Sequence, residues 1–124
     1  MSAIDLIKHL DNIVVSDDVA KIEQLYNTVL TIKNKRLLSI PPGSYDVGKK
    51  FCRKLTLKEV LNFSDYFGLD VIQAGLVPLF DLSDGVFMAW RINELDYCLF
   101  SVVDGICFRV CQTIEDVVNK TFKV

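Results

Sequence analysis

The chain has 124 residues and a mass of 14.1 kDa, a length typical of a single domain, which we expect to span residues 1–124. Its hydrophobic content of 51% is sufficient for a core, and its charged fraction of 24% excludes a disordered chain. The net charge of −2 and the pI of about 5.3 argue against nucleic-acid binding, and no apolar run approaches the roughly 20 residues of a membrane helix.

The N-terminal residues predict two amphipathic helices. Ser2 caps the first, whose apolar residues recur at helical spacing over residues 4–10. Charged residues interrupt this run, so it does not resemble a secretory signal, and we expect a cytoplasmic protein. Ser16 caps the second helix, whose apolar stripe runs from Val19 to Leu30.

Residues 31–60 form a basic segment. They contain eight Lys or Arg residues and two acids, a local charge of +6, so the rest of the chain carries −8. Residues 31–40 fit either a short helix or an edge strand, and Pro41 and Pro42 end either one. Residues 44–54 predict a polar loop or a short strand. A lysine-rich loop is typical of a solvated edge, so we expect no nucleic-acid partner.

A capping box marks the next helix. Thr56 and Glu59 have the required spacing, and the helix should run to about Phe67, with Gly68 as the left-handed residue after its end. Beyond it, the sequence predicts an antiparallel meander with a closing helix: a short strand Leu76–Phe80, strands over 86–92, 97–103 and 106–112, and a helix over 113–122.

The pair Asp104-Gly105 predicts a two-residue type I′ hairpin. That loop would pair Phe100 with Arg109 and Cys98 with Cys111. A four-residue loop over 93–96 would place Trp90 opposite Leu99 and Ala89 opposite Phe100.

Alternation along these strands predicts two different faces. One is almost wholly apolar and should be covered by the helices; it contains Val86, Met88, Trp90, Ile92, Tyr97, Leu99, Ser101, Val103, Ile106, Phe108 and Val110. The second is mixed, and either the 31–55 segment covers part of it or it binds a partner. In the second case the expected contact residues are Phe87, Arg91, Phe100 and Arg109.

The meander also brings two loops to one end of the sheet. Asp81 and Asp84 in one loop and Asp104 in the other would then form an acidic end. These aspartates are common in turns for conformational reasons alone. Alternatively, they form a rim that attracts a basic protein.

The residues needed for catalysis or metal binding are sparse. His9 is the only histidine, and no Gly-x-Ser-x-Gly or Cys-x-x-Cys motif is present. The four cysteines lie in apolar contexts and are expected to be reduced and buried. We therefore expect a protein-binding domain, not an enzyme, with no catalytic residues, no metal and no cofactor.

From Leu55 onward, and over about 100 residues in all, the chain resembles the SUKH superfamily, domains similar to a fungal cell-wall-assembly regulator. The resemblance rests on the capped helix at Thr56, the Leu-x-Pro strand at 76–80, the Asp/Gly-rich turn at 81–85, the following hairpin and the closing helix at 113–122. The N-terminal helix that ends at Leu30 also fits.

The resemblance implies an α+β fold, an antiparallel meander with amphipathic helices packed mainly on one face. It further implies a bacterial immunity protein that occludes the surface of a toxin, such as a basic nuclease. The alternative is a self-associating structural or regulatory module. In either case we expect a monomer or a weak homodimer, with no membrane partner.

Overall fold

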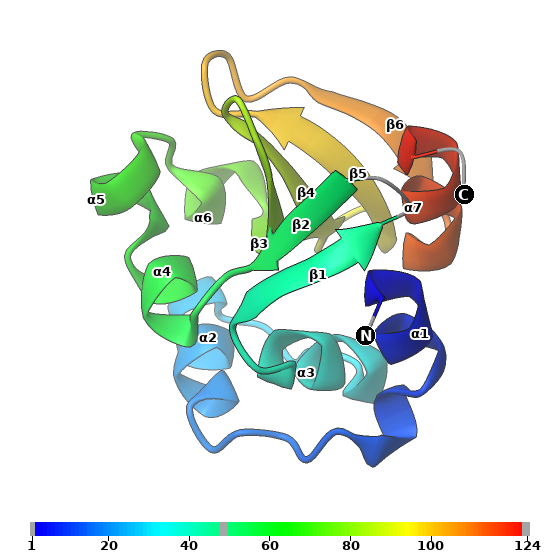
Figure 1. Ribbon diagram of the computed structural model, residues 1–124. Coiled ribbons are helices and arrows are strands. Elements are labelled where there is room, and N and C mark those ends of the chain that lie inside the picture. The colour runs from blue at the N-terminus through cyan, green and yellow to red at the C-terminus, as the bar shows by residue number, and fades with distance from the viewer. Residues whose placement is uncertain (1, 48–49, 123–124) are drawn as a thin grey trace.

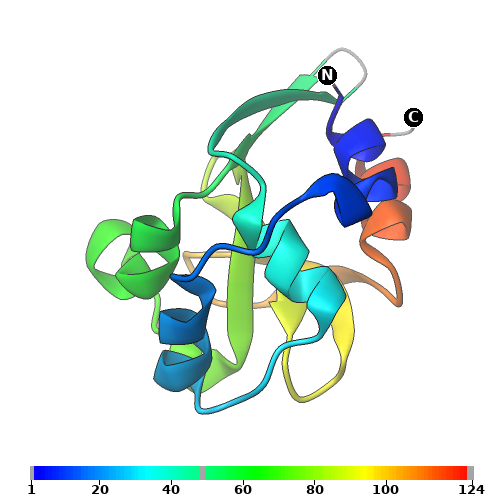
Figure 2. The ribbon, with the colours of Figure 1, turned by 90° about the horizontal axis from the view of Figure 1, so that it is seen from below.

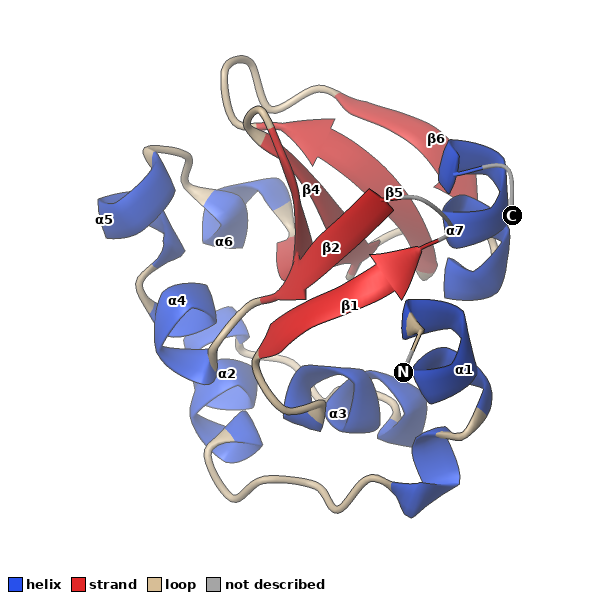
Figure 3. Cartoon of the chain, in the orientation of Figure 1, coloured by secondary structure: helices blue, strands red, loops and turns tan. Residues whose placement is uncertain are grey.

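A single antiparallel sheet organises the molecule, and its six strands follow one another in sequence order (Figures 1 and 3). The computed structural model describes residues 2–47 and 50–122. The strands are β1 Gly43–Val47, β2 Lys50–Lys54, β3 Leu76–Ser83, β4 Val86–Arg91, β5 Asp96–Ser101 and β6 Cys107–Cys111. The helices are α1 Ala3–Lys8, η1 Leu10–Asn12, α2 Val19–Tyr26, α3 Ile32–Ser39, α4 Leu57–Leu61, α5 Phe63–Phe67, α6 Val71–Ala74 and α7 Ile114–Phe122. The predicted α+β class and antiparallel meander are confirmed.

The basic segment forms regular structure where the sequence left alternatives open. Residues 32–39 are helical, and Thr31 caps this helix by accepting a hydrogen bond from the Asn34 amide. The β1–β2 hairpin takes the place of the predicted loop or short strand at 44–54, of which residues 48 and 49 lie outside the described residues. It joins the main sheet through only two residue pairs, Arg53 with Asp81 and Lys54 with Phe80.

The caps of the helices agree in part with the prediction. The capping box at Thr56 is present in full, but Asn62 breaks the predicted helix into α4 and α5 before Gly68 ends it at φ 83°. Ser2 caps α1 as predicted. Ser16 does not cap α2, because that helix begins at Val19 and the Ser16 hydroxyl accepts from the Asp18 amide in the preceding turn.

The two-residue type I′ turn occurs at the other Asp-Gly pair. Asp84 and Gly85 have φ values of 56° and 75° and join β3 directly to β4, so β3 extends to Ser83. The prediction of such a turn at Asp104 and Gly105 is wrong. There only Gly105 has a positive φ, and a longer loop over 102–106 connects β5 and β6.

Both hairpin registers differ from the prediction by two residues. Trp90 pairs with Tyr97 in place of Leu99, and Phe100 pairs with Cys107 in place of Arg109. A slip of two residues keeps every side chain on its original face, so the separation of Trp90 from Phe100 is retained.

A bulge in β6 breaks this alternation. Arg109 has φ 50°, and beyond it Cys111 pairs with Tyr97, which belongs to the first face. Cys98 and Cys111 are therefore not cross-strand neighbours as predicted. Cys107 lies beside Cys98 instead, and burial together with this neighbour raises the pKa of the Cys98 thiol.

Helices cover both faces of the sheet. On the first face, the Tyr97 hydroxyl donates to Asn34 of α3 over 2.8 Å, and Lys33 joins α3 to α7 through Glu115 at 3.0 Å. Figure 2 shows α3 lying over the strands on this side, with α1 beside α7. On the second face, α5 packs against β4 and β5 through an aromatic cluster, Phe63, Phe67, Phe87 and Phe100. The second face is thus covered by the helices that follow Leu55 and not by the 31–55 segment.

Candidate functional site

Two of the three aspartates predicted at the acidic end, Asp84 and Asp104, lie in loops that a direct hydrogen bond joins. The Val102 amide donates to the Gly85 carbonyl over 2.9 Å, so the β3–β4 turn and the β5–β6 loop lie together at the top of Figure 1. Asp84 and Asp104 are both exposed there and form no ion pair with any described residue. The Asp104 carboxylate also accepts from the Ile106 amide at 3.0 Å, which holds the loop in shape.

Asp81 does not belong with them. Its carboxylate accepts from Arg53 of β2 at 3.2 Å and from the Ser83 amide at 2.8 Å. Arg53 also forms a bidentate ion pair with Glu59 of α4, with hydrogen bonds of 2.8 and 3.0 Å. This interaction lowers the pKa of the Glu59 carboxyl. Asp81 therefore helps to fasten the β1–β2 hairpin and α4 to the main sheet, and its prediction as a partner contact is corrected to a structural role.

The predicted contact residues of the second face are mostly unavailable. Phe87 and Phe100 are 1% and 0% exposed beneath α5, so their prediction as partner contacts is wrong. Arg91 donates two hydrogen bonds to Asp96, of 2.6 and 2.8 Å, across the β4–β5 loop. The Asp96 carboxylate raises the pKa of the Arg91 guanidinium. Because α5 supplies aromatic partners, the face is core and not surface.

Arg109 is the exception, because it lies exposed on β6. Its guanidinium donates to the Lys120 carbonyl at 2.7 Å, near the end of α7, where a cation complements the helix dipole. Within the described residues, no strand pairs with the outer side of β6, which makes it an edge of the sheet.

Several large apolar side chains remain exposed along this edge. Val103 and Ile106 in the loop are 88% and 62% exposed, and Phe108 and Val110 on the strand are 40% and 44% exposed. The sequence prediction assigned all four to the helix-covered face. The last strand of a meander is an edge, and this position was the signal that could have revealed their exposure.

The loop carrying Val103 is supported from below. A Cβ placed on Gly105 would lie 3.3 Å from the Leu69 side chain, which comes from the segment between α5 and α6. The exposed apolar residues thus project from a braced loop beside two unpaired carboxylates. We define the binding end as Asp84, Val103, Asp104 and Ile106.

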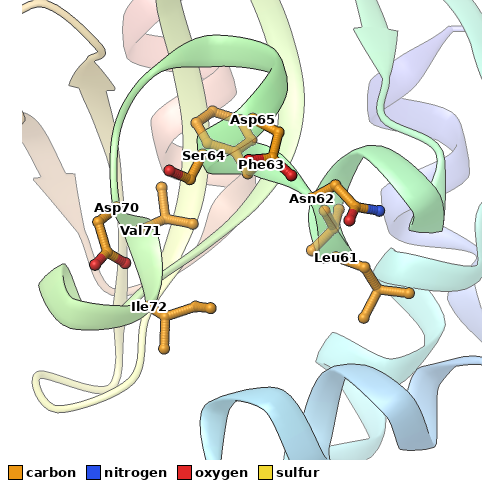
Figure 4. A pocket seen from close by; sticks show the side chains of 9 residues that line it. Leu61, Asn62, Phe63, Ser64, Asp65, Asp70, Val71 and Ile72 are labelled. Carbon is orange, nitrogen blue, oxygen red and sulfur yellow. The ribbon is translucent and has the colours of Figure 1, made fainter.

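The small hollow between α4, α5 and α6 is not a promising ligand site. Figure 4 shows Leu61 and Asn62 on one side of it and Asp70, Val71 and Ile72 on the other. Its volume is about 90 Å³, well below the range of about 300–1,000 Å³ typical of small-molecule sites.

Lys54 is the most unusual ionisable residue in the core. It is 1% exposed, and its ammonium donates to the carbonyls of Leu38 at the end of α3 and Leu55 before α4, at 2.9 and 2.8 Å. Burial lowers the pKa of the amine to about 8, an effect that the charge of Glu59 partly offsets. The Leu38 carbonyl lies in the last turn of α3, where carbonyls lack intrahelical partners, so we interpret Lys54 as a structural residue that caps α3 and also bonds to Leu55.

The remaining reactive groups do not converge. The four thiols are unbridged, and burial raises the pKa of Cys52 to about 12. His9 is exposed on α1, where its ring bonds to the Asp5 carbonyl at 2.8 Å. Among residues 2–47 and 50–122, no three His, Cys, Asp or Glu side chains gather as metal ligands would.

No helix in the described part of the chain combines the length and apolarity needed to cross a bilayer. No protein-family model matches the sequence, and no curated protein matches it significantly. The resemblance to the SUKH superfamily therefore stays a prediction.

Proposed function

We propose that this chain is a non-enzymatic protein-binding domain that uses its binding end. The observation that carries the proposal is the exposure of Val103 and Ile106 between Asp84 and Asp104. Apolar side chains exposed together within a polar rim are typical of protein interaction sites. Burying them against a partner would supply affinity, and the carboxylates would supply orientation and encounter rate.

The charge distribution supports a basic partner. Residues 61–108 contain seven acids and one basic residue, Arg91, so this segment carries a net charge of −6. Asp81 and Asp96 are neutralised by arginines, whereas Asp84 and Asp104 are not paired among the described residues. Their field faces outward and favours a cationic protein surface.

Together with the resemblance to SUKH domains, this chemistry supports an immunity protein. It would neutralise a bacterial toxin with a basic surface, such as a nuclease, by occluding that surface. No covalent step is involved, and the inhibitory complex needs only the exposed side chains of the folded chain.

The test needs a candidate toxin, to be sought among the proteins encoded beside this chain's gene, and it measures the growth of cells that express that toxin with and without the chain. Asp84→Asn with Asp104→Asn removes both charges while Asn preserves the turn geometry of each position. Asp11→Asn with Glu94→Gln makes the same charge change at exposed acids outside the binding end. The first pair should weaken protection and the second should not. Full protection by the first pair, with both proteins equally stable, would remove the basis of the proposal.

The free edge of β6 supports a second function, self-association. Phe108 and Val110 are exposed on that edge, and a second copy could bury them. Light scattering separates the two functions, because a stable dimer that Phe108→Ser converts to monomer would favour self-association over toxin binding.

A further inference from the structure

A groove next to the binding end, with which it shares Asp84, opens between the β1–β2 hairpin and the C-terminal elements. Its volume is about 320 Å³. Six apolar side chains line it, one from each of five successive strands and one from α7: Phe51, Leu82, Val86, Leu99, Phe108 and Phe122. The curl of the sheet therefore brings β2 opposite β6 and α7, as the position of β2 in Figure 3 indicates.

The groove leaves aromatic surface in contact with water. Phe51 is 63% exposed and Phe108 is 40% exposed, although both have apolar neighbours on the groove wall. Exposed aromatic surface that faces a hollow is unfavourable in the free protein and becomes favourable when a ligand removes it from water. The apolar lining of the groove therefore suits a ligand with an apolar chain or ring.

The groove also presents an unsatisfied polar atom. The Thr121 hydroxyl oxygen is buried and has no hydrogen-bond partner among the described residues. Buried hydroxyls are normally paired, because an unpaired one loses its bond to water without replacement. Thr121 lines the groove, but its hydroxyl is buried, so the side chain would have to rotate before a ligand could supply the missing partner.

Three charged side chains line the same groove. Lys50 and Arg109 each contribute one positive charge and Asp84 contributes one negative charge, so the lining of the groove has a net charge of +1. The bond from Arg109 to the Lys120 carbonyl uses one guanidinium nitrogen and anchors the group beside α7. An anionic head group, with oxygens that accept from Arg109 and Lys50, complements this set.

We propose that the groove binds a small amphipathic carboxylate, a free ligand with an apolar chain or ring and one carboxylate group. The chain would lie between Phe51 and Phe108, and the carboxylate would lie toward Arg109 and Lys50. The volume falls at the lower end of the range for small-molecule sites, about 300–1,000 Å³, which favours a short ligand over a protein segment. The proposal does not rest on toxin binding, although Asp84 belongs to both the groove wall and the binding end.

Calorimetric titration of the full chain with decanoate tests the proposal, with decanol as the uncharged analogue. Decanoate should bind saturably below its micellar concentration and at least tenfold more tightly than decanol. Phe51→Ser and Phe108→Ser should each weaken decanoate at least tenfold. Tyr66→Ser, at an aromatic residue 51% exposed on α5, is the matched control and should leave binding unchanged.

The charge requirement has its own variants. Lys50→Gln and Arg109→Gln should each weaken decanoate while leaving decanol unchanged, and Lys58→Gln, outside the groove, should affect neither. Thermal unfolding of each variant verifies that it folds. The proposal is overturned if decanoate does not bind, if the folded Phe51→Ser variant binds it with unchanged affinity, or if decanol binds as tightly as decanoate.

Discussion

The buried amine of Lys54 makes the stability of this protein depend on pH in a way that one substitution can isolate. Lys54→Met keeps an unbranched side chain of similar length and removes the ionisable group. At neutral pH it has two opposing effects. It eliminates the cost of burying a charge, but it also leaves the carbonyls of Leu38 and Leu55 without their donor. The informative quantity is therefore the pH dependence and not the stability at one pH.

The magnitude follows from the displacement of the pKa. The pKa of the Lys54 amine falls from its ordinary value of 10.5 to about 8 in the folded protein. At pH 7, where the amine is charged, this difference lowers the free energy of unfolding by about 3 kcal/mol. Between pH 8 and 10.5 the unfolded chain binds more protons than the folded chain, so this contribution to stability rises with pH. By pH 9.5, about 2 kcal/mol of the penalty should be relieved in the natural protein. Lys54→Met should lack this rise.

Urea unfolding followed by Trp90 fluorescence measures the effect, since Trp90 is the only tryptophan and is 8% exposed. Both proteins are compared at pH 7.0, 8.5 and 9.5 under reducing conditions. The raised pKa of Cys52 opposes the trend above pH 9, but it does so in both proteins and cancels in their difference. Lys58→Met, at an exposed lysine of α4, is the control and should follow the natural protein. Parallel stability profiles for the natural protein and Lys54→Met would refute the reasoning.

Three further substitutions test the packing by urea unfolding at pH 7. Thr121→Val removes a hydroxyl with no partner among the described residues and should stabilise the protein by up to about 1 kcal/mol; a loss of stability would reveal a partner. Phe63→Ala empties the centre of the aromatic cluster under α5 and should cost about 3–5 kcal/mol, whereas Tyr66→Ala on the exposed side should cost less than about 1 kcal/mol. Asp81→Asn should cost about 1–2 kcal/mol through Arg53, whereas Asp84→Asn should be nearly neutral, and equal costs would contradict the separation of the two aspartates.

The two Asp-Gly pairs illustrate how far local sequence predicts this fold. Both carry the same turn signal, yet only Asp84-Gly85 forms the two-residue turn. At Asp104-Gly105, tertiary contacts determine the loop, because Val102 donates to Gly85 and the Leu69 side chain lies where a Cβ on Gly105 would come within 3.3 Å of it. Turn propensity predicts that the chain reverses, and long-range contacts decide how many residues the reversal takes.

Along β4 and β5, the assignment of side chains to faces survived the register errors for a physical reason. Side chains alternate with a period of two, so errors of two residues at both hairpins left Trp90 and Phe100 on opposite faces. What covers each face has no comparable local signal. The capping box at Thr56 predicts that a helix begins but not that Phe63 will lie over Phe87, and the candidate contacts on the second face were misassigned for that reason.

Lys54 shows the same limit for charged residues. In the sequence it is one of eight basic residues in a segment expected to be solvated. Its neighbour Arg53 is partly exposed and ion-paired, whereas Lys54 points to the other side of β2 and is buried. Strand alternation separates the two residues, but the positions of the Leu38 and Leu55 carbonyls explain why a lysine is tolerated inside.

The bulge at Arg109 bears on which partner the free edge accepts. An unpaired β6 would ordinarily invite another strand, including the same strand of a second copy. The positive φ of Arg109 interrupts the regular alternation of amide and carbonyl groups along the edge after Phe108. In addition, a two-fold symmetric pairing of β6 with the β6 of a second copy, centred at Arg109, would place two Arg109 side chains opposite each other. Both features oppose extension of the sheet. The exposed loop side chains Val103 and Ile106 are not subject to this constraint, because they project beyond the strand beside Asp104. Recognition of a different protein through side chains of the binding end is therefore better supported than self-association through the backbone of β6.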